Sequence, residues 1–291
     1  MPRLTVVMPA WNAESTISTA LRSTLVALPR DAEILVYDDA STDGTRRAVE
    51  RFTGRTSRVS LIDGQRNIGA GEARNELIAR SDSEFVAAMD ADDVCLPHRF
   101  VAYRRQMSKS DLLFAPIARF EHRSRVHVPR PAALSPAAMP VALIVLNPVP
   151  QSTMVARRDA LEGSATYRHG HAEDYELWLR LAAGGARISL TSFPTVAYRN
   201  HPGQSTSKPS YQQEVRDNGF LIDSYSVLAT TVLGVDARGM STEELRARLE
   251  RIVDHVESSR DRKHIRRLLR SRWSFPLRAP SDGSSHESDE Q

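Results

Sequence analysis

Short apolar runs alternate with helix-like segments along the first 90 residues, and this alternation restricts the fold more than any other feature. Four apolar runs have the length and composition of buried strands: 4–8, 33–37, 58–62 and 84–89. Three helix-like segments lie between them: 15–28, 44–52 and 72–81. Strands joined by helices of this length pair in parallel through right-handed crossovers. We therefore predict a doubly wound α/β sheet.

The composition is that of a globular protein without a membrane-spanning helix. The chain has 291 residues, 41% of them hydrophobic, and its longest apolar run, 141–146, is far too short to cross a bilayer. The single cysteine, Cys95, excludes an internal disulfide and suits a reducing compartment. The first residues lack the pattern of a secretion signal. We expect a cytoplasmic protein.

Polar side chains follow the predicted strands at the points where these strands end. They are Asn12 after the first strand, Asp38 and Asp39 after the second, and Asp90 and Asp92 after the fourth. Ligands of doubly wound sheets bind beyond the carboxyl ends of the strands. We therefore expect a ligand site at this edge of the sheet.

The stretch FVAAMDADDVCLP, at 85–97, ends an apolar run with three acids. Residues two apart in a strand point to the same side, so Asp90 and Asp92 can converge on Mg²⁺ or Mn²⁺. A metal that bridges to a bound diphosphate would cancel the repulsion between the acids. The alternative is a solvated turn that caps the next helix, with Pro97 in its first turn. The motif alone leaves these two interpretations about equal.

Two further loops suit nucleotide contacts and ordinary turns alike. In YDDASTDGT, at 37–45, the two carboxylates suit a base N–H or ribose hydroxyls, but the residues favour a turn and a helix N-cap. In QRNIGAGEARN, at 65–75, a glycine-containing loop enters a helix with Arg66 and Arg74 available to an anion. This loop matches neither glycine-rich phosphate motif, so its signal is weak.

Two acids, Glu173 and Asp174, stand at the start of a predicted helix in HAEDYELW, at 171–178. The helix dipole and the free N–H groups stabilise a carboxylate there as the anion, which suits a general base. Ordinary helix-start acids are the alternative. His201 lies in a loop, where a lone histidine is more often exposed than a ligand.

The remaining segments predict a less regular second half. Strands are expected at 111–116, 151–156, 186–190 and 195–199, and helices at 138–146 and 172–185, the latter with Trp178 on its apolar side. From about Tyr211 the chain is helical and rich in arginine, and 279–291 has the composition of a disordered segment.

The segment 260–278 carries eight Lys or Arg residues against one Asp, interleaved with apolar residues. Three interpretations stay open, in decreasing weight. Its leucines pack on the preceding domain, it contacts an anionic membrane surface, or it binds nucleic acid or a protein partner. The helix expected at 241–256 either packs internally or forms a homodimer contact.

The chain resembles family 2 glycosyltransferases with the GT-A fold over about residues 4–206. Seven stretches stand in the order expected of that family: VVMPAWN, VYDDASTDGT, RNIGAGEARN, MDADD, NPVPQSTMVARR, EDYELWLRLA and YRNHPGQST. The resemblance implies a GT-A-type, Rossmann-like, mostly parallel sheet flanked by helices. We accordingly expect a catalytic domain at 1–208, a helical, basic extension at 209–278 and a disordered tail at 279–291.

The resemblance also implies roles for single residues. Asp174 would be the catalytic base, and Asp92 would hold the metal, with His201 as a further ligand or phosphate contact. The nucleotide pocket would comprise Pro9, Ala10, Asn12, Asp38, Asp39, Asn67, Arg74, Asp90 and Ala91. Within it, Asp39 would bond the base, uracil in the usual case, and Asp90 would lie near the ribose. Gln151 stands where many relatives carry histidine, and it would face the acceptor or sugar with Glu173 and Trp178.

These roles describe an inverting transferase that depends on Mn²⁺ or Mg²⁺. Its donor would be a nucleotide-diphosphate sugar, expected to be a UDP-sugar, and its acceptor a glycan, lipid-linked or small-molecule hydroxyl in cell-envelope synthesis. We expect it in the cytoplasm, with contact to the inner face of the membrane through 260–278. The alternative is a catalytically silent sugar-nucleotide-binding protein, and the presence of both Asp92 and Asp174 argues against it. No nucleic-acid-binding motif is present, so we expect no nucleic-acid partner.

Overall fold

A seven-stranded sheet, in the order β10-β6-β9-β4-β1-β2-β3, forms the centre of the protein. The computed structural model describes residues 3–101, 103–121, 125–128, 133–163, 165–201, 204 and 209–270. The strands of this sheet are β1 (Leu4–Ala10), β2 (Ala32–Asp38), β3 (Val59–Asp63), β4 (Phe85–Ala88), β6 (Leu112–Phe114), β9 (Val155–Arg157) and β10 (Ile188–Leu190). All pairs in it are parallel except those that β9 makes with β4 and β6.

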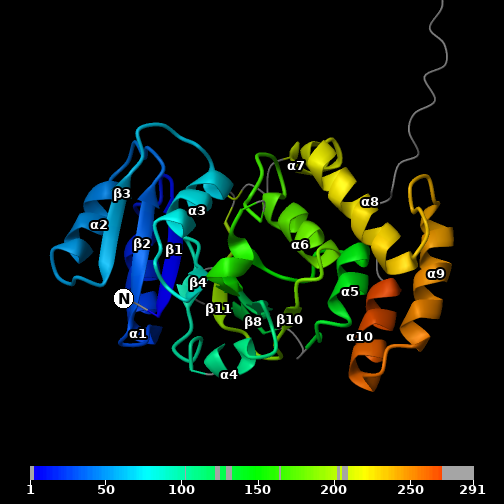
Figure 1. Cartoon of the computed structure of the whole chain (residues 1–291). Coiled ribbons are helices and arrows are strands. Elements are labelled where there is room, and N and C mark those ends of the chain that lie inside the picture. The colour runs from blue at the N-terminus through cyan, green and yellow to red at the C-terminus, as the bar shows by residue number, and fades with distance from the viewer. Residues whose placement is uncertain are drawn as a thin grey trace, which may run out of the picture.

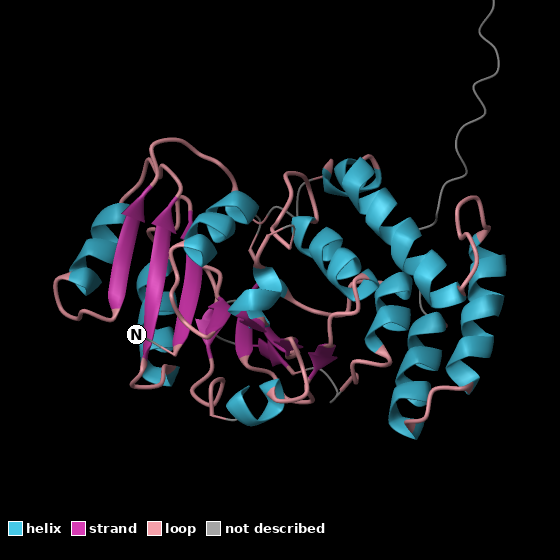
Figure 2. Ribbon diagram, in the orientation of Figure 1, coloured by secondary structure: helices cyan, strands magenta, loops and turns pink. Residues whose placement is uncertain are grey.

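Helices flank the sheet and form most of the C-terminal third of the described chain (Figures 1 and 2). They are α1 (Ile17–Ala27), α2 (Thr45–Thr53), α3 (Ala70–Ala79), α4 (Tyr103–Met107), α5 (Met139–Val145), α6 (Glu173–Ala183), α7 (Tyr211–Arg216), α8 (Gly219–Leu233), α9 (Thr242–Asp254) and α10 (Ser259–Leu269).

Strand alternation divides the core between the two faces of the sheet. In β1, Val6 and Met8 belong to one buried cluster with Ile17 of α1, whereas Val7 belongs to a second cluster with Leu77 of α3. Successive residues of a strand point to opposite faces, so both faces of β1 are covered. The prediction of a mostly parallel α/β sheet between helices is confirmed.

β1 continues through Pro9, where we expected it to end. It pairs with β2 as far as Ala10, but with β4 only from Leu4 to Val7. Pro9 has no N–H to donate, and it lies beyond the part of β1 that has neighbours on both sides. The strand therefore loses no hydrogen bond on its β4 side.

The strand expected at 151–156 is wrong in its first half. Gln151–Thr153 form a 3₁₀ turn, in which the N–H groups of Thr153 and Met154 donate to the carbonyls of Pro150 and Gln151. Only β9 is extended, from Val155. The turn places Gln151 outside the sheet.

A second, four-stranded sheet has the order β5-β11-β7-β8. Its strands are β5 (Val94–Cys95), β7 (Ile117–Glu121), β8 (Arg125–His127) and β11 (Val196–Arg199). Only β11 was expected, because the other strands are too short or too polar to show an alternating pattern. β5 pairs antiparallel with β11, and this pairing brings the chain after Asp92 alongside the chain before His201.

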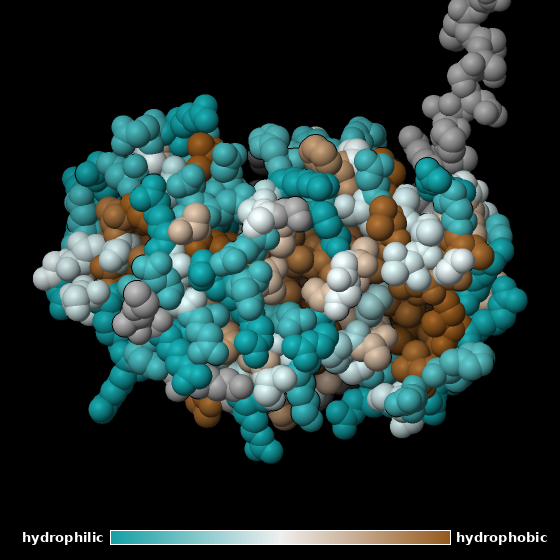
Figure 3. Space-filling view, in the orientation of Figure 1, coloured by the Kyte–Doolittle hydropathy of each residue, from teal (hydrophilic) through white to brown (hydrophobic). Residues whose placement is uncertain are grey.

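The C-terminal helices pack on the sheet domain instead of standing apart. Tyr225 of α8, Leu249 of α9 and Ile265 of α10 belong to the same buried cluster as Trp178 of α6. The apolar face of α9 therefore packs internally, which is one of the two interpretations of 241–256. The view in Figure 3 shows an apolar area where α8, α9 and α10 meet.

The basic segment 260–278 forms α10 as far as Leu269. Its end, 271–278, and the tail expected at 279–291 lie outside the described residues. Among the helices of the described chain, none combines the length and the hydropathy needed to cross a membrane.

Candidate active site

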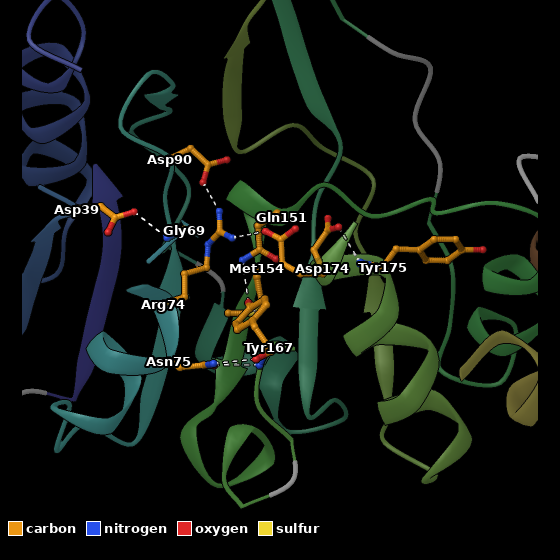
Figure 4. Close-up of polar contacts among 11 residues, drawn as sticks. Asp39, Gly69, Arg74, Asn75, Asp90, Gln151, Met154, Tyr167, Asp174 and Tyr175 are labelled. Carbon is orange, nitrogen blue, oxygen red and sulfur yellow. Dashed lines mark hydrogen bonds and ion pairs between the residues drawn. The ribbon is translucent and has the colours of Figure 1, made fainter. Parts of the chain in front are cut away.

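Arg74 links the end of β4 to the start of α6. Its guanidinium donates from Nη2 to Asp90 Oδ1 over 2.9 Å and from Nη1 to Glu173 Oε1 over 3.2 Å (Figure 4). Burial alone lowers the pKa of Arg74, whose side chain is 6% exposed, but the charges of Asp90 and Glu173 raise this pKa above its usual value. Two acids that are far apart in sequence are thus held together by one buried cation.

Gly71 permits the close approach of α3 to α6. A Cβ at this position would lie 2.9 Å from Glu173 Cγ, closer than side chains pack. One turn later, the Asn75 side chain donates to the Tyr167 carbonyl over 2.8 Å and accepts from the Tyr167 N–H over 2.9 Å. α3 therefore fixes the chain that precedes α6.

Asp174 is the second residue of α6, and the residue as a whole is partly exposed. Its Oδ1 accepts from the Tyr175 N–H over 2.7 Å. Loss of surrounding water and the charge of Glu173 raise the pKa of Asp174 to about 7, although Arg74 acts in the opposite direction. A carboxyl with this pKa can take up and release a proton near neutral pH, as a general base must.

Glu176, the third acid of α6, has a structural role. It is 1% exposed, and its carboxylate accepts hydrogen bonds from Arg180, Arg168 and Ser224 at 2.8–3.2 Å. Ser224 belongs to α8, so Glu176 ties α6 to the C-terminal helices. α6 thus carries Asp174 at the candidate active site and Glu176 on the side that faces α8.

Asp92 and His201 meet at the edge formed by β5 and β11. His201 Nε2 lies 2.9 Å from Asp92 Oδ2, with side chains 35% and 30% exposed. Burial and the charge of Asp90 raise the pKa of Asp92, while the hydrogen bond to His201 lowers it. The alternative interpretation of 85–97 is right about the turn, which residues 91–93 form. It is wrong about the helix cap, since the turn leads into β5 and α4 begins only at Tyr103.

The carboxylate oxygen of Asp92 is the kind of ligand that Mn²⁺ and Mg²⁺ prefer, and the His201 imidazole beside it would be a less usual one. Among the described residues, no group of three or more His, Cys, Asp or Glu side chains is placed to hold a metal. A cation held by Asp92 and His201 therefore needs oxygen atoms from water or from a bound diphosphate. Such partial protein ligation is usual for Mg²⁺ at phosphate sites.

Asp93 was not singled out in the sequence, and it fastens β11. It is 0% exposed, and its Oδ1 accepts from the Arg199 N–H over 3.0 Å. Burial and the charges of Asp90 and Asp92 raise the pKa of Asp93 to about 8. Of the three acids after β4, Asp90 forms an ion pair with Arg74, Asp92 is the partly exposed candidate metal ligand, and Asp93 is buried and holds β11. No pattern in the sequence indicated this role, because β5, the strand that follows Asp93, has only two residues.

Asp39 organises the loop between β3 and α3. Its carboxylate accepts from the N–H groups of Ile68 and Gly69 over 2.7 and 2.9 Å, and the Asn67 side chain donates to its carbonyl over 3.4 Å. Gly69 has a φ of 84°, which few other residues adopt. Contacts of Asp39 and Asn67 with a nucleotide stay predictions.

The turn after β2 is closed by its own side chains, as the turn interpretation of 37–45 predicted. Asp38 is buried, and its Oδ1 accepts from the Ser41 N–H over 3.2 Å. Asn12 Oδ1 accepts from the Thr42 N–H over 2.9 Å, which joins the ends of β1 and β2. Nucleotide contacts of Asn12 and Asp38 stay predictions.

Gln151 lies beneath Arg74 and next to Tyr167. Its Nε2 donates to the Tyr167 hydroxyl over 2.9 Å, and its buried Oε1 has no hydrogen-bond partner within the described part of the chain.

Trp178 does not line a pocket, contrary to expectation: it is 0% exposed and packs edge-on against Phe114 and Tyr167. Its apolar helical spacing reflected core packing.

The remaining residues of the predicted nucleotide pocket are buried. Pro9 and Ala10 are buried at the end of β1, and Ala91 is buried after β4, so their proposed contacts stay predictions. Trp11, by contrast, is 58% exposed directly after β1. The sequence signal that we missed is a tryptophan in the turn that leaves a buried strand.

Comparison with known families and proteins gives one consistent answer. The sequence model described as Glycosyl transferase family 2 matches residues 5–137. The amylovoran biosynthesis glycosyltransferase AmsE of Erwinia amylovora is 29% identical over 182 residues, covering 61% of this chain and 66% of that protein. A second relative, of Escherichia coli, is the UDP-Glc:alpha-D-GlcNAc-diphosphoundecaprenol beta-1,3-glucosyltransferase WfgD. It is 33% identical over 111 residues, covering 38% of this chain and 43% of that protein. The chain thus aligns with less than two thirds of either relative.

Solved structures share the fold. S. aureus TarS, in complex with UDP-GlcNAc, has a TM-score of 0.63 at 20% identity, covering 87% of this chain and 72% of that one. The mannosyltransferase PcManGT from Pyrobaculum calidifontis, in complex with GDP-Man and Mn²⁺, has a TM-score of 0.53 at 17% identity, covering 91% and 68%. The sheet is that of a GT-A fold, and residues 5–137 match the sequence model of glycosyl transferase family 2.

Proposed function

We propose that the protein is an inverting glycosyltransferase that moves a sugar from a UDP-sugar to a hydroxyl group of a glycan or lipid-linked acceptor. The names of the relatives support this proposal, since WfgD is named for a UDP-glucose donor and a diphosphoundecaprenol-linked acceptor, and AmsE for the synthesis of a polysaccharide. The TarS structures contain UDP and UDP-GlcNAc.

The observation that carries the proposal is the placement of Asp174. Arg74 holds the start of α6 beside the carboxyl end of β4, where ligands of such sheets bind. Asp174 follows Glu173 directly, is partly exposed and has a pKa of about 7. A carboxyl that titrates at this edge is suited to deprotonate an acceptor hydroxyl.

The proposed reaction is a single displacement at the anomeric carbon of the donor sugar. The acceptor oxygen forms a bond to that carbon while the bond from the carbon to the diphosphate oxygen breaks. Asp174 takes the proton of the acceptor hydroxyl, and the nucleoside diphosphate leaves with the bonding electrons. Because attack and departure occur on opposite sides, the configuration of the anomeric carbon inverts.

Asp92 and His201 would hold the Mn²⁺ or Mg²⁺ ion, and the bound ion would supply charge stabilisation for the leaving diphosphate. Asp39, Asn67 and Asn12 would form the nucleotide side of the pocket. Arg74 keeps Asp90 and Glu173 in place and lowers the pKa of Asp174, so that more of the base is ionised at neutral pH. Gln151, next to these groups, would contact the sugar or the acceptor.

The test is calorimetric titration of the protein with UDP, dTDP and GDP, each with and without Mn²⁺, followed by assay of transfer from the sugar form of the nucleotide that binds. Binding that Mn²⁺ strengthens, together with an inverted glycoside product, is the expected result. Binding without any transfer or donor hydrolysis would favour the alternative, a catalytically silent sugar-nucleotide-binding protein.

A further inference from the structure

A basic groove of about 1180 Å³ lies between α10 and the turn that joins β10 to β11. The turn contributes Ser192 and Phe193, and α10 contributes most of the rest. Six of the lining residues are cations: Arg260, Arg262, Lys263, Arg266, Arg267 and Arg270. No acidic residue of the described chain lines the groove.

The packing of α10 accounts for this one-sided charge. Asp261, Ile265 and Leu269 are buried at intervals of four residues and face the protein. Asp261 is the one acid of the helix, and it accepts a hydrogen bond from Ser135 over 2.6 Å inside the protein. The cations therefore lie on the outer side of α10, and Asp261 does not lie among them.

Two of the six cations have partners, and four do not. Arg266 pairs with Asp254 over 2.7 Å, and Arg262 donates to the carbonyls of Val256 and Glu257. Within the described residues, the side chains of Arg260, Lys263, Arg267 and Arg270 make no hydrogen bond and no ion pair. All four are exposed. Their spacing of three, four and three residues puts them on one helical face.

Phe193 stands beside these cations in the β10–β11 turn and is 70% exposed. Exposed cations next to an exposed aromatic match a membrane surface, where anionic headgroups overlie an apolar layer. The charge and the apolar side chain thus point to the same partner.

The groove opens at the edge of the sheet that carries the candidate active site. β10 and β6 are parallel, and β9 runs antiparallel to both β6 and β4. β10 therefore runs in the direction of β4, and the turn after β10 leaves the sheet at the same edge as Asp90. The turn that borders the groove and the candidate active site thus both follow the carboxyl ends of strands in the same sheet.

We propose that α10 and the β10–β11 turn form a docking surface for the anionic phospholipid headgroups of a membrane. The proposal does not depend on the transferase reaction, because it uses none of the residues of the candidate active site. Each exposed Lys or Arg near an anionic membrane contributes about fivefold to binding. The four unpaired cations are enough to hold the protein at such a surface reversibly.

The test is co-sedimentation of the full chain with vesicles of phosphatidylcholine alone and of phosphatidylcholine and phosphatidylglycerol in equal amounts. The protein should bind only the anionic vesicles and should be released by salt. Reversal of three charges (Arg260→Glu, Lys263→Glu and Arg267→Glu) should weaken this binding by about 100-fold or more. Phe193→Ser should weaken it less, and without changing its salt dependence.

The control is a second triple reversal with the same change of net charge, on α2 and the turn that follows it: Arg47→Glu, Arg51→Glu and Arg55→Glu. These side chains are also exposed. The α2 variant should bind anionic vesicles nearly as well as the unaltered protein. An equal loss in both variants, or no binding of the unaltered protein to anionic vesicles, would overturn the proposal. Retention on DNA in place of vesicles would assign the groove to nucleic acid.

Discussion

Arg74 and Asp90 form a buried ion pair, 2.9 Å long, that joins α3 to the end of β4. The same guanidinium holds Glu173, so one cation connects the predicted nucleotide side of the site to the helix that carries Asp174. A buried cation with two anionic partners is costly to disturb from either side. The relative position of the two halves of the site is therefore part of the folded core.

Replacement of Arg74 should lower the stability of the fold and raise the pKa of the proposed base, Asp174. In Arg74→Gln, Asp90 and Glu173 lose their buried partner, and we expect a loss of about 3–5 kcal/mol in the free energy of unfolding. The pKa of Asp174 should rise, because Arg74 lowers it. Urea denaturation and the pH profile of transfer measure the two effects. Arg80→Gln, which removes an exposed pair with Glu76, should cost less than about 1 kcal/mol. Equal costs in both variants would contradict the bridging role.

Asp92 should govern metal-dependent donor binding. Asp92→Asn keeps the size of the side chain but removes the charged oxygen, so we expect the affinity gained by adding Mn²⁺ to fall by more than about tenfold. Affinity for UDP without metal should change little. Titration of UDP with and without Mn²⁺ measures both quantities. Unchanged enhancement by Mn²⁺ would remove Asp92 from the metal site.

Because of Asp174, the free energy of unfolding should fall as the pH rises. Its pKa of about 7 in the folded protein lies above the ordinary value of 3.8. Between these values the unfolded chain releases the proton while the folded protein retains it, so stability falls through this range and levels off above about pH 7. Asp174→Asn should be the more stable protein at about pH 8, by up to about 4 kcal/mol, with no difference near pH 3. Thermal unfolding at both pH values tests this, and equal stability at about pH 8 would speak against the raised pKa.

Glu176 should behave in the opposite way to Asp174. Glu176→Gln leaves Arg180 and Arg168 without their buried carboxylate, and we expect a loss of about 3–5 kcal/mol in the free energy of unfolding. Donor binding per folded molecule should be preserved, because Glu176 faces α8 and not the sheet edge. Denaturation and UDP titration separate the two effects. Loss of UDP affinity in the folded variant would show that Glu176 belongs to the site.

The part of the fold that sequence periodicity predicted well is the first sheet domain. The apolar runs that became β1, β2 and β4 are buried on both faces, so their composition alone identified them. β3, at the edge of the sheet, is only partly buried, but its run is apolar enough to be recognised. The short strands β5, β7 and β8 were missed because their partners, and not their own sequences, determine their extended form. The antiparallel position of β9 between β4 and β6 also depends on long-range packing.

The roles of single residues also divide into those that the sequence predicted and those that depend on packing. The ends of parallel strands located Asn12, Asp39 and Asp90 at one edge of the sheet. The helical pattern could not separate Glu173 from Asp174, because both are acids at the same helix start and only the folded structure pairs Glu173 with Arg74. Trp178 was misassigned for the same reason, since an aromatic residue suits both a core and a pocket.

The most direct test of the transferase proposal compares Asp174→Asn with the unaltered protein for donor binding and for transfer, over a range of pH. The unaltered enzyme should gain turnover as the pH rises, with a midpoint near 7, where Asp174 becomes ionised. The variant should bind the donor with unchanged affinity, and its transfer should be slower by about 100-fold or more, with the midpoint near 7 abolished. A variant that transfers sugar at a near-normal rate, with the same dependence on pH, would contradict the assignment of Asp174 as the base.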